Sequence, residues 1–180
     1  MLKTRITPEL FLNRILFLII IMTMIFLLSC SKDTTSPEDN DLKLMLSPAD
    51  QTVPMNTEAD YVVKIENADN LFAFSTEIVF DNSIAEFVQN AVVIGSFWNP
   101  ELVDLSVVED DRLNITISLQ QTSSEDGIDG SGDLFTFSII GSTLGSSNLT
   151  FENLLMIDED GEPISNFNEI EIMNGTLTVE

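Results

Sequence analysis

Apolar and polar residues alternate one by one along most of the chain beyond residue 41. In the segment 71–80, every second residue from Phe72 to Phe80 falls on one side, and all but Thr76 are apolar. In the segment 113–120 the alternation is stricter, with Leu or Ile at each odd position and a polar residue at each even one. A period of two is typical of a β-strand that buries one face, so both segments are predicted to be strands.

Further segments share this pattern or the same β-prone composition. They predict strands at 42–46, 61–66, 85–88, 102–108, 134–140, 148–151 and 175–179. Turn-forming residues separate them at 67–70, 81–82, 99–100, 109–111, 127–132 and 158–161, and one helical turn is expected near 83–86. Short strands at this spacing, with almost no helical periodicity, predict an all-β protein built as an antiparallel β-sandwich of about nine strands.

The order of these pieces resembles the cohesin domain, a β-sandwich that docks dockerin modules. The segments that carry the resemblance are 67–81, where an Asn-containing turn leads into a strand ending in Phe-Asp, and then 84–88, 92–95, 130–137, 158–164 and 174–179. The similarity extends from about residue 53 to residue 179. It implies a jelly-roll-like topology and a non-catalytic module that binds a protein partner. The family 2 and family 3 carbohydrate-binding modules share this architecture, so polysaccharide recognition is the alternative.

Cohesins bind their partners mainly through one flat sheet face, and the resemblance carries that face to particular residues here. On the strand that ends in Phe80-Asp81 it implies Ala73, Ser75 and Glu77. On a neighbouring strand, we expect the polar residues Asn114, Thr116 and Ser118 to join them. Small polar side chains suit a flat protein contact, although an ordinary solvated strand face has the same composition.

The best single candidate for a ligand-facing aromatic residue is Trp98, the only tryptophan in the chain. It follows Gly95 in an expected loop, and sugar-binding sandwiches stack exposed planar aromatics on pyranose rings. The competing interpretation is that Trp98 closes one end of the core, where its N–H would need a hydrogen-bond partner. No extended strip of aromatic residues is present for a crystalline polysaccharide.

No metal site or cofactor is predicted. Asp158, Asp160 and Glu162 flank Gly161, and Glu169 occupies the twelfth position counted from Asp158, as in a calcium-binding EF-hand loop. Pro163 and the absence of flanking helical patterns favour a tight hairpin turn instead. The chain has no histidine, which excludes Ser-His-Asp and Cys-His nucleophile systems and imidazole-based zinc sites. Two carboxylates could still serve a glycosidase, but no recognisable acid pair stands out among so many acidic residues, so we expect no enzyme.

The N-terminal residues indicate export and a lipid anchor. Three basic residues precede an uncharged apolar run of 14 residues at 15–28, too short for a spanning helix of about 20 residues. Leu27-Leu28-Ser29-Cys30 then resembles the lipobox of bacterial lipoproteins, which implies that Cys30 is lipidated and becomes the first residue after cleavage. The alternative is an ordinary cleaved signal that leaves Cys30, the only cysteine, as a free thiol.

This N-terminal pattern predicts the domain organisation: a signal peptide at 1–29, a polar flexible tether at 30–41 and the folded domain at 42–180. Ser31 after the cysteine favours the outer membrane as the destination. Without residues 1–29 the chain keeps 29 acidic and 4 basic residues, a formal net charge of −25. Such a charge excludes a nucleic-acid-binding protein, because phosphate contacts need a basic face.

Overall fold

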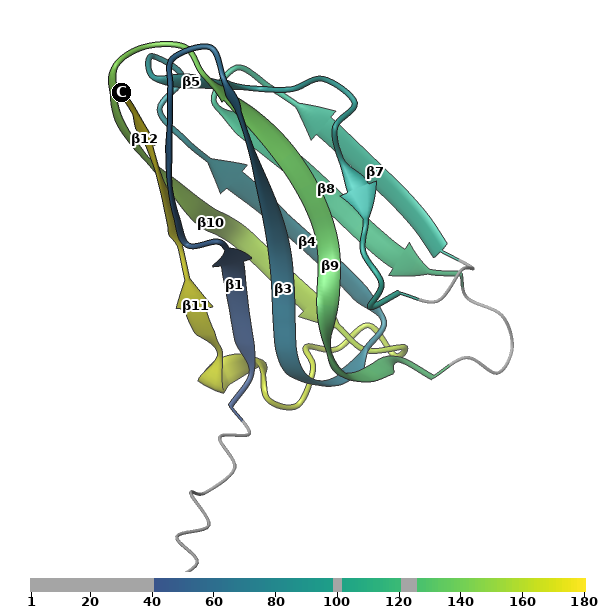
Figure 1. Cartoon of the computed structure of the whole chain (residues 1–180). Coiled ribbons are helices and arrows are strands. Elements are labelled where there is room, and N and C mark those ends of the chain that lie inside the picture. Colours follow the sequence, from purple (N-terminus) through teal and green to yellow (C-terminus); the bar gives the residue numbers. More distant parts are fainter. Residues whose placement is uncertain (1–40, 99–101, 121–125) are drawn as a thin grey trace, which may run out of the picture. The chain divides into compact units, whose positions relative to one another are not determined.

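The structure, a computed structural model, describes residues 41–98, 102–120 and 126–180. They belong to one compact unit, Asn40–Glu180, built from two packed β-sheets (Figure 1). The strands are β1 Lys43–Ser47, β2 Asp50–Val53, β3 Glu58–Leu71, β4 Ala73–Val79, β5 Ala85–Phe87, β6 Val93–Ile94, β7 Leu102–Val108, β8 Arg112–Leu119, β9 Ile128–Gly141, β10 Gly145–Ile157, β11 Glu171–Met173 and β12 Gly175–Val179. Within these ranges there is one 3₁₀ turn, η1, which covers Phe167–Glu169.

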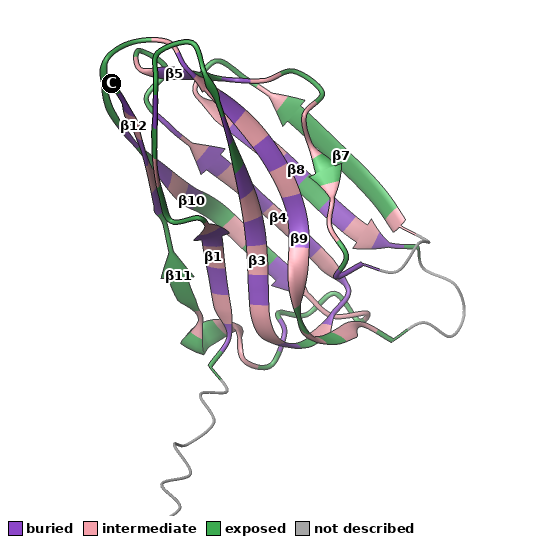
Figure 2. Ribbon diagram, viewed as in Figure 1, coloured by how far each residue is buried: buried purple, intermediate pink, exposed green. Residues whose placement is uncertain are grey.

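The alternation of the sequence becomes alternation of burial in the central strands. In β4 the buried residues are Phe74, Thr76 and Ile78, and in β8 every odd residue from Leu113 to Leu119 is buried. Figure 2 shows the resulting bands of buried and half-buried residues along β3, β4, β8 and β9. The two inner faces pack together into one hydrophobic core, in which Phe135 and Phe137 of β9 are almost completely buried.

The two sheets have the strand orders β11-β1-β3-β9-β5, with β6 also beside β9, and β2-β12-β10-β4-β8-β7. All neighbouring pairs are antiparallel except β1 with β11 and β2 with β12, which are parallel. These two parallel pairs arise because the chain passes from the first sheet to the second both between β1 and β2 and between β11 and β12. The prediction of an all-β sandwich is confirmed.

Two of the predicted turns are wrong. Residues 67–70 lie inside β3 and most of 127–132 lies inside β9, and these two long strands pair with each other across irregular register shifts. Asn67, Asn70 and Gly130 have positive φ angles of 57°, 58° and 110°. Asparagine and glycine tolerate this left-handed conformation, which serves β-bulges as well as turns. The chain therefore bends at these positions and continues in the sheet.

The helical turn expected near 83–86 is present just before β5. The N–H groups of Ile84 and Ala85 donate to the carbonyl of Asp81 at 3.0 and 3.1 Å. Within the described ranges, no helix is long and apolar enough to cross a membrane. The predicted leader, with its apolar run at 15–28, lies outside those ranges.

Candidate functional site

The six residues predicted to form a binding face lie together in the structure. β4 and β8 are antiparallel neighbours, and their Cα partners are Ala73 with Ser118, Ser75 with Thr116, and Glu77 with Asn114. Their sequence neighbours Phe74, Ile115 and Ile117 are buried, so these six side chains point away from the core. The structure thus brings the two predicted segments together on one surface, in direct cross-strand register.

The same surface continues onto the strands at either side. In β10, Leu155 is the Cα partner of Ser75, and in β7, Leu105 is the partner of Thr116. A straight row therefore crosses four strands in the order Leu155, Ser75, Thr116, Leu105. The parallel rows on either side are Ile157, Ala73, Ser118, Val103 and Glu152, Glu77, Asn114, Val107. We call these twelve residues the sheet face.

The centre of the sheet face is small and polar. The hydroxyl oxygens of Ser75 and Thr116 lie 2.9 Å apart and share a hydrogen bond across the two strands. Side chains of this size protrude little from the backbone of the sheet. A flat surface with few protruding groups suits another folded protein better than it suits a small molecule, which needs a concave site.

Charge gathers at one end of the sheet face. Arg112 Nη1 donates to Glu77 Oε2 at 2.8 Å, and the guanidinium also holds both carboxylate oxygens of Asp111 at 3.1 and 3.2 Å. The hydrogen bonds from Arg112 lower the pKa of Asp111, and those to Asp111 and then Glu77 raise the pKa of Arg112. Arg112 is thus a fixed cation shared by Glu77 and Asp111, so this cluster keeps a net negative charge, and Glu152 is the other carboxylate of the sheet face.

Apolar side chains flank the polar centre, and sequence reasoning did not single them out. Leu155 is 48% exposed on β10, while Val103, Leu105 and Val107 are 59%, 64% and 44% exposed on β7. Figure 2 shows β7 exposed along most of its length. Contiguous exposed apolar residues on a folded domain mark interaction surfaces. Hydropathy alone predicts that apolar residues lie in the core. Only the pairing register of their strands reveals that these side chains face outward.

Trp98 is buried, which corrects the expectation that it faces a ligand. Its side chain is 7% exposed, and its indole N–H donates to the carbonyl of Leu134 at 3.1 Å. The ring of Phe97 meets it edge-on, with centroids 5.3 Å apart. A ring enclosed in this way has no free surface for a sugar. This buried position agrees with the competing interpretation, in which Trp98 closes one end of the core.

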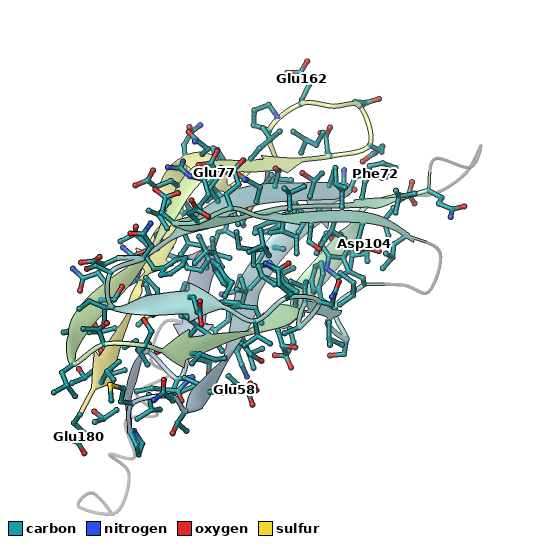
Figure 3. All side chains as sticks on the ribbon, turned by 90° about the horizontal axis from the view of Figure 1, so that it is seen from above. Glu58, Phe72, Glu77, Asp104, Glu162 and Glu180 are labelled. Atoms are coloured by element: carbon teal, nitrogen blue, oxygen red, sulfur yellow. The ribbon has the colours of Figure 1, made fainter. Side chains whose placement is uncertain are left out.

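The acidic segment 158–162 forms a hairpin-like turn. The backbone N–H groups of Asp160 and Glu162 both donate to Oδ1 of Asp158, at 3.0 and 2.9 Å. In Figure 3, Glu162 lies on a loop that projects from the sandwich. Within the described part of the chain, no three acidic, histidine or cysteine side chains are grouped closely enough to hold a metal ion. Cys30 lies outside the described residues.

Several solved structures with a similar arrangement of strands are cohesins. A non-cellulosomal cohesin from the archaeon Archaeoglobus fulgidus is similar over 78% of this chain and 90% of its own, with a TM-score of 0.60 and 22% identity. The fold is that of a cohesin domain. The OlpC cohesin of Clostridium thermocellum, solved in complex with a dockerin, covers 78% of this chain and 94% of its own, with a TM-score of 0.63 and 16% identity.

Another similar structure is the sixth cohesin of scaffoldin B from Acetivibrio cellulolyticus, in complex with a Cel5 dockerin. It covers 78% of this chain and 99% of its own, with a TM-score of 0.62 and 13% identity. No family model matches the sequence, and no curated protein matches it significantly. The cohesin fold therefore appears in the structure at identities where sequence comparison finds no relative. It agrees with the prediction of a cohesin-like β-sandwich.

Proposed function

We propose that this protein is a non-catalytic binding module that docks a protein partner on the sheet face. The observation that carries this proposal is the pattern across β10, β4, β8 and β7. A small polar centre around Ser75 and Thr116 lies between apolar residues on both sides, Leu155 and the β7 residues Val103, Leu105 and Val107. Burying such apolar flanks stabilises a complex, while the flat centre allows close approach.

A dockerin module is the partner that the comparisons favour. The OlpC cohesin and the sixth scaffoldin B cohesin were each solved in complex with a dockerin, and both share the fold of this chain. At 16% and 13% identity, these structures support the fold and do not assign contact residues in this chain. The proposal for this chain therefore rests on its own sheet face, with the fold as support.

Carbohydrate binding is the alternative function, and the surface gives it less support. Within the residues that the structure describes, no aromatic side chain is exposed: the phenylalanines, Tyr61 and Trp98 are buried or half-buried. Stacking on a sugar ring needs an accessible aromatic face. A sugar would have to be held by hydrogen bonds alone on the described surface.

We further propose that the module is exported and held at a bacterial membrane, the outer membrane in particular, by lipid on Cys30. The support is the basic start, the apolar run at 15–28 and the lipobox-like Leu27-Leu28-Ser29-Cys30. Each buried methylene contributes about 0.8 kcal/mol, and more than one acyl chain gives a durable anchor. The polar residues 31–41 would then serve as a tether between lipid and domain.

Two screens separate the proposed function from its alternative. Purified protein without residues 1–29, with Cys30→Ser, would be titrated with dockerin modules encoded in the same genome and applied to a glycan array. Micromolar or tighter binding of a dockerin is expected, without retention of glycans. Glycan retention with no dockerin bound would contradict the proposal.

The anchor has its own test. The mass of the protein isolated from membranes is expected to correspond to a chain that begins at Cys30 and carries diacylglyceryl and acyl groups. A chain that begins elsewhere, or an unmodified Cys30, would contradict the anchor without affecting the proposed binding face.

A further inference from the structure

β7 is the last strand of its sheet and has an open edge. Among the described residues it pairs only with β8. The N–H of Glu109 donates to the carbonyl of Arg112 at 2.9 Å, so this pair closes the β7–β8 hairpin. Hydrogen-bonded and non-hydrogen-bonded pairs alternate along an antiparallel ladder. The N–H and C=O groups of Asp104 and Ser106 therefore point away from β8, toward the open edge.

The bonds of β8 to its other neighbour agree with this assignment. The N–H of Leu119 donates to the carbonyl of Phe72, at the end of the β4–β8 ladder. The odd residues of β8 thus bond to β4, and its even residues, Asn114, Thr116 and Ser118, bond to β7. Their partners on β7 are Val107, Leu105 and Val103. The backbone N–H and C=O groups of these three residues are therefore bonded to β8.

The side chains in the middle of β7 are inverted relative to a normal sandwich strand, whereas Leu102 and Val108 at its ends are half-buried against the core. Val103, Leu105 and Val107 lie on the outer side, exposed, although they are the apolar members of the alternation. Asp104 and Ser106 are paired with the inward-facing Ile117 and Ile115, yet both are exposed too. The other sheet therefore leaves the middle of β7 uncovered, and this strand is accessible on both faces and along one edge.

Open edges are usually blocked, because a row of unpaired backbone groups recruits another strand. A charged side chain such as that of Asp104 opposes the addition of another strand. The exposed apolar residues beside it, Val103, Leu105 and Val107, favour association. A second copy of this chain is a poor occupant on grounds of charge. Residues 41–180 contain 26 acidic and 3 basic residues, and these three cations, Lys43, Lys64 and Arg112, each lie within 3.7 Å of a carboxylate.

We propose that the open edge of β7 binds an extended segment of a partner protein, added as an antiparallel strand in which basic residues alternate with apolar ones. The basic residues of the added strand lie opposite Asp104 and Ser106, with their side chains on the inner side of the sheet. The apolar residues lie beside Val103, Leu105 and Val107 on the outer side. Main-chain hydrogen bonds supply affinity in this mode of recognition, and alternate side chains supply specificity. This edge adjoins the sheet face and shares Val103, Leu105 and Val107 with it, whereas Asp104 and Ser106, whose backbone groups would hold the added strand, are not part of that face.

The geometry fixes which amide groups of the peptide face β7. In an antiparallel strand, these belong to the residues paired with Asp104 and Ser106, which are the basic ones. The test uses acetyl-Lys-Val-Lys-Val-Lys-Val-Lys-amide, titrated by calorimetry into the protein without residues 1–29 and with Cys30→Ser. N-methylation of the lysines should weaken binding by about tenfold or more, since each loses a backbone donor. N-methylation of the valines, at equal charge, should change it by less than about threefold.

Substitutions on β7 test the same contact from the side of the protein. Ser106→Pro removes an N–H that points to the open edge and leaves the β8 ladder intact, so it should weaken peptide binding by about tenfold. Asp104→Asn should weaken it by a few fold and reduce its dependence on salt. Unchanged far-ultraviolet circular dichroism and melting temperature would show that these variants are folded.

Leu155→Arg distinguishes this proposal from the proposed function. Leu155 lies on β10, three strands from β7, so the substitution should impair docking on the sheet face and leave the peptide affinity unchanged. Absence of peptide binding by the unaltered protein would overturn the proposal and show that Asp104 only blocks the edge. Equal binding of the two N-methylated peptides would also overturn it, since attraction by charge alone would then account for the affinity.

Discussion

Tyr61 is the buried residue whose ionisation the structure perturbs most clearly. Its hydroxyl donates to the carbonyl of Thr176 at 3.2 Å, and its ring stacks on Phe137 at 5.6 Å between centroids. Burial, with a smaller contribution from the charge of Asp50, raises the pKa of Tyr61 from 10.0 to about 12. A pKa raised by folding gives stability that is fully present below the unfolded value and is lost as the pH rises to the folded one.

We therefore expect the free energy of unfolding to fall between pH 10 and about pH 12. Urea denaturation at a series of pH values measures this dependence. Tyr61→Phe should flatten the curve in that range and cost about 1 kcal/mol at neutral pH through the lost hydrogen bond. An identical slope in the Tyr61→Phe variant would contradict the assignment.

Trp98 should behave as a core residue. Trp98→Ala is expected to lower the free energy of unfolding by about 3–5 kcal/mol, because it leaves a cavity against Phe97. Trp98→Phe keeps much of the ring, but it leaves the carbonyl of Leu134 without its donor and should cost less. A Trp98→Ala variant as stable as the unaltered protein would show that the ring is accessible after all.

The sequence could offer Trp98 only as two alternatives. A lone tryptophan after a glycine is compatible with a loop or with the core, and the choice depends on whether an acceptor such as the Leu134 carbonyl is near. That acceptor is 36 residues away along the chain. The six face residues were more predictable. Strict alternation assigns Asn114, Thr116 and Ser118 to the side opposite the apolar residues, and the resemblance to cohesins selected the side with Ala73, Ser75 and Glu77.

At the scale of elements, a bulge in β10 determines which residue faces outward. Glu152 pairs with Glu77 and Leu155 pairs with Ser75, so β10 has one residue more than β4 over this interval. The extra residue is accommodated at Asn153, whose φ angle is positive, 50°. Because the side-chain period is two, the extra residue moves Leu155 onto the sheet face and returns Met156 to the core.

Asn153→Gly should therefore be tolerated, whereas Asn153→Val should lower the free energy of unfolding by about 1–2 kcal/mol, since a β-branched residue resists positive φ. Denaturant unfolding of the two variants provides the comparison. Equal stability of both would contradict the role assigned to this bulge.

Strand prediction succeeded in the segments with long alternation. It failed where the position of a strand in the sheet determined its length or which side was buried. β4 and β8 follow their patterns because each lies between two neighbours and buries one face. β2, β6 and β11 have two to four residues and lie at the margins of the sheets, too short for a pattern to show. In β7, the apolar side faces solvent, and only its register with β8 reveals this.

At the scale of the whole molecule, charge should oppose stability. With 26 acidic and 3 basic residues in 41–180, the folded domain concentrates negative charge on its surface. Salt shortens the range of that repulsion to a Debye length of about 10 Å at 0.1 M. The melting temperature is expected to rise by several degrees between 10 and 300 mM sodium chloride, as measured by scanning calorimetry. No rise would show that the surface carboxylates are spaced too widely to repel one another.

The central claim is that the sheet face docks a protein partner. Its most direct test is the dissociation constant for a dockerin from the same genome, measured with two matched variants. Thr116→Arg places a long cation at the centre of the sheet face, and Thr136→Arg makes the same change on β9 of the opposite sheet, where Thr136 alternates with the buried Phe135 and Phe137. The account predicts that Thr116→Arg weakens binding by about a hundredfold or more, as for a substitution at the centre of an interface, while Thr136→Arg leaves it within about twofold. Equal effects of the two variants, or an effect of Thr136→Arg alone, would contradict it.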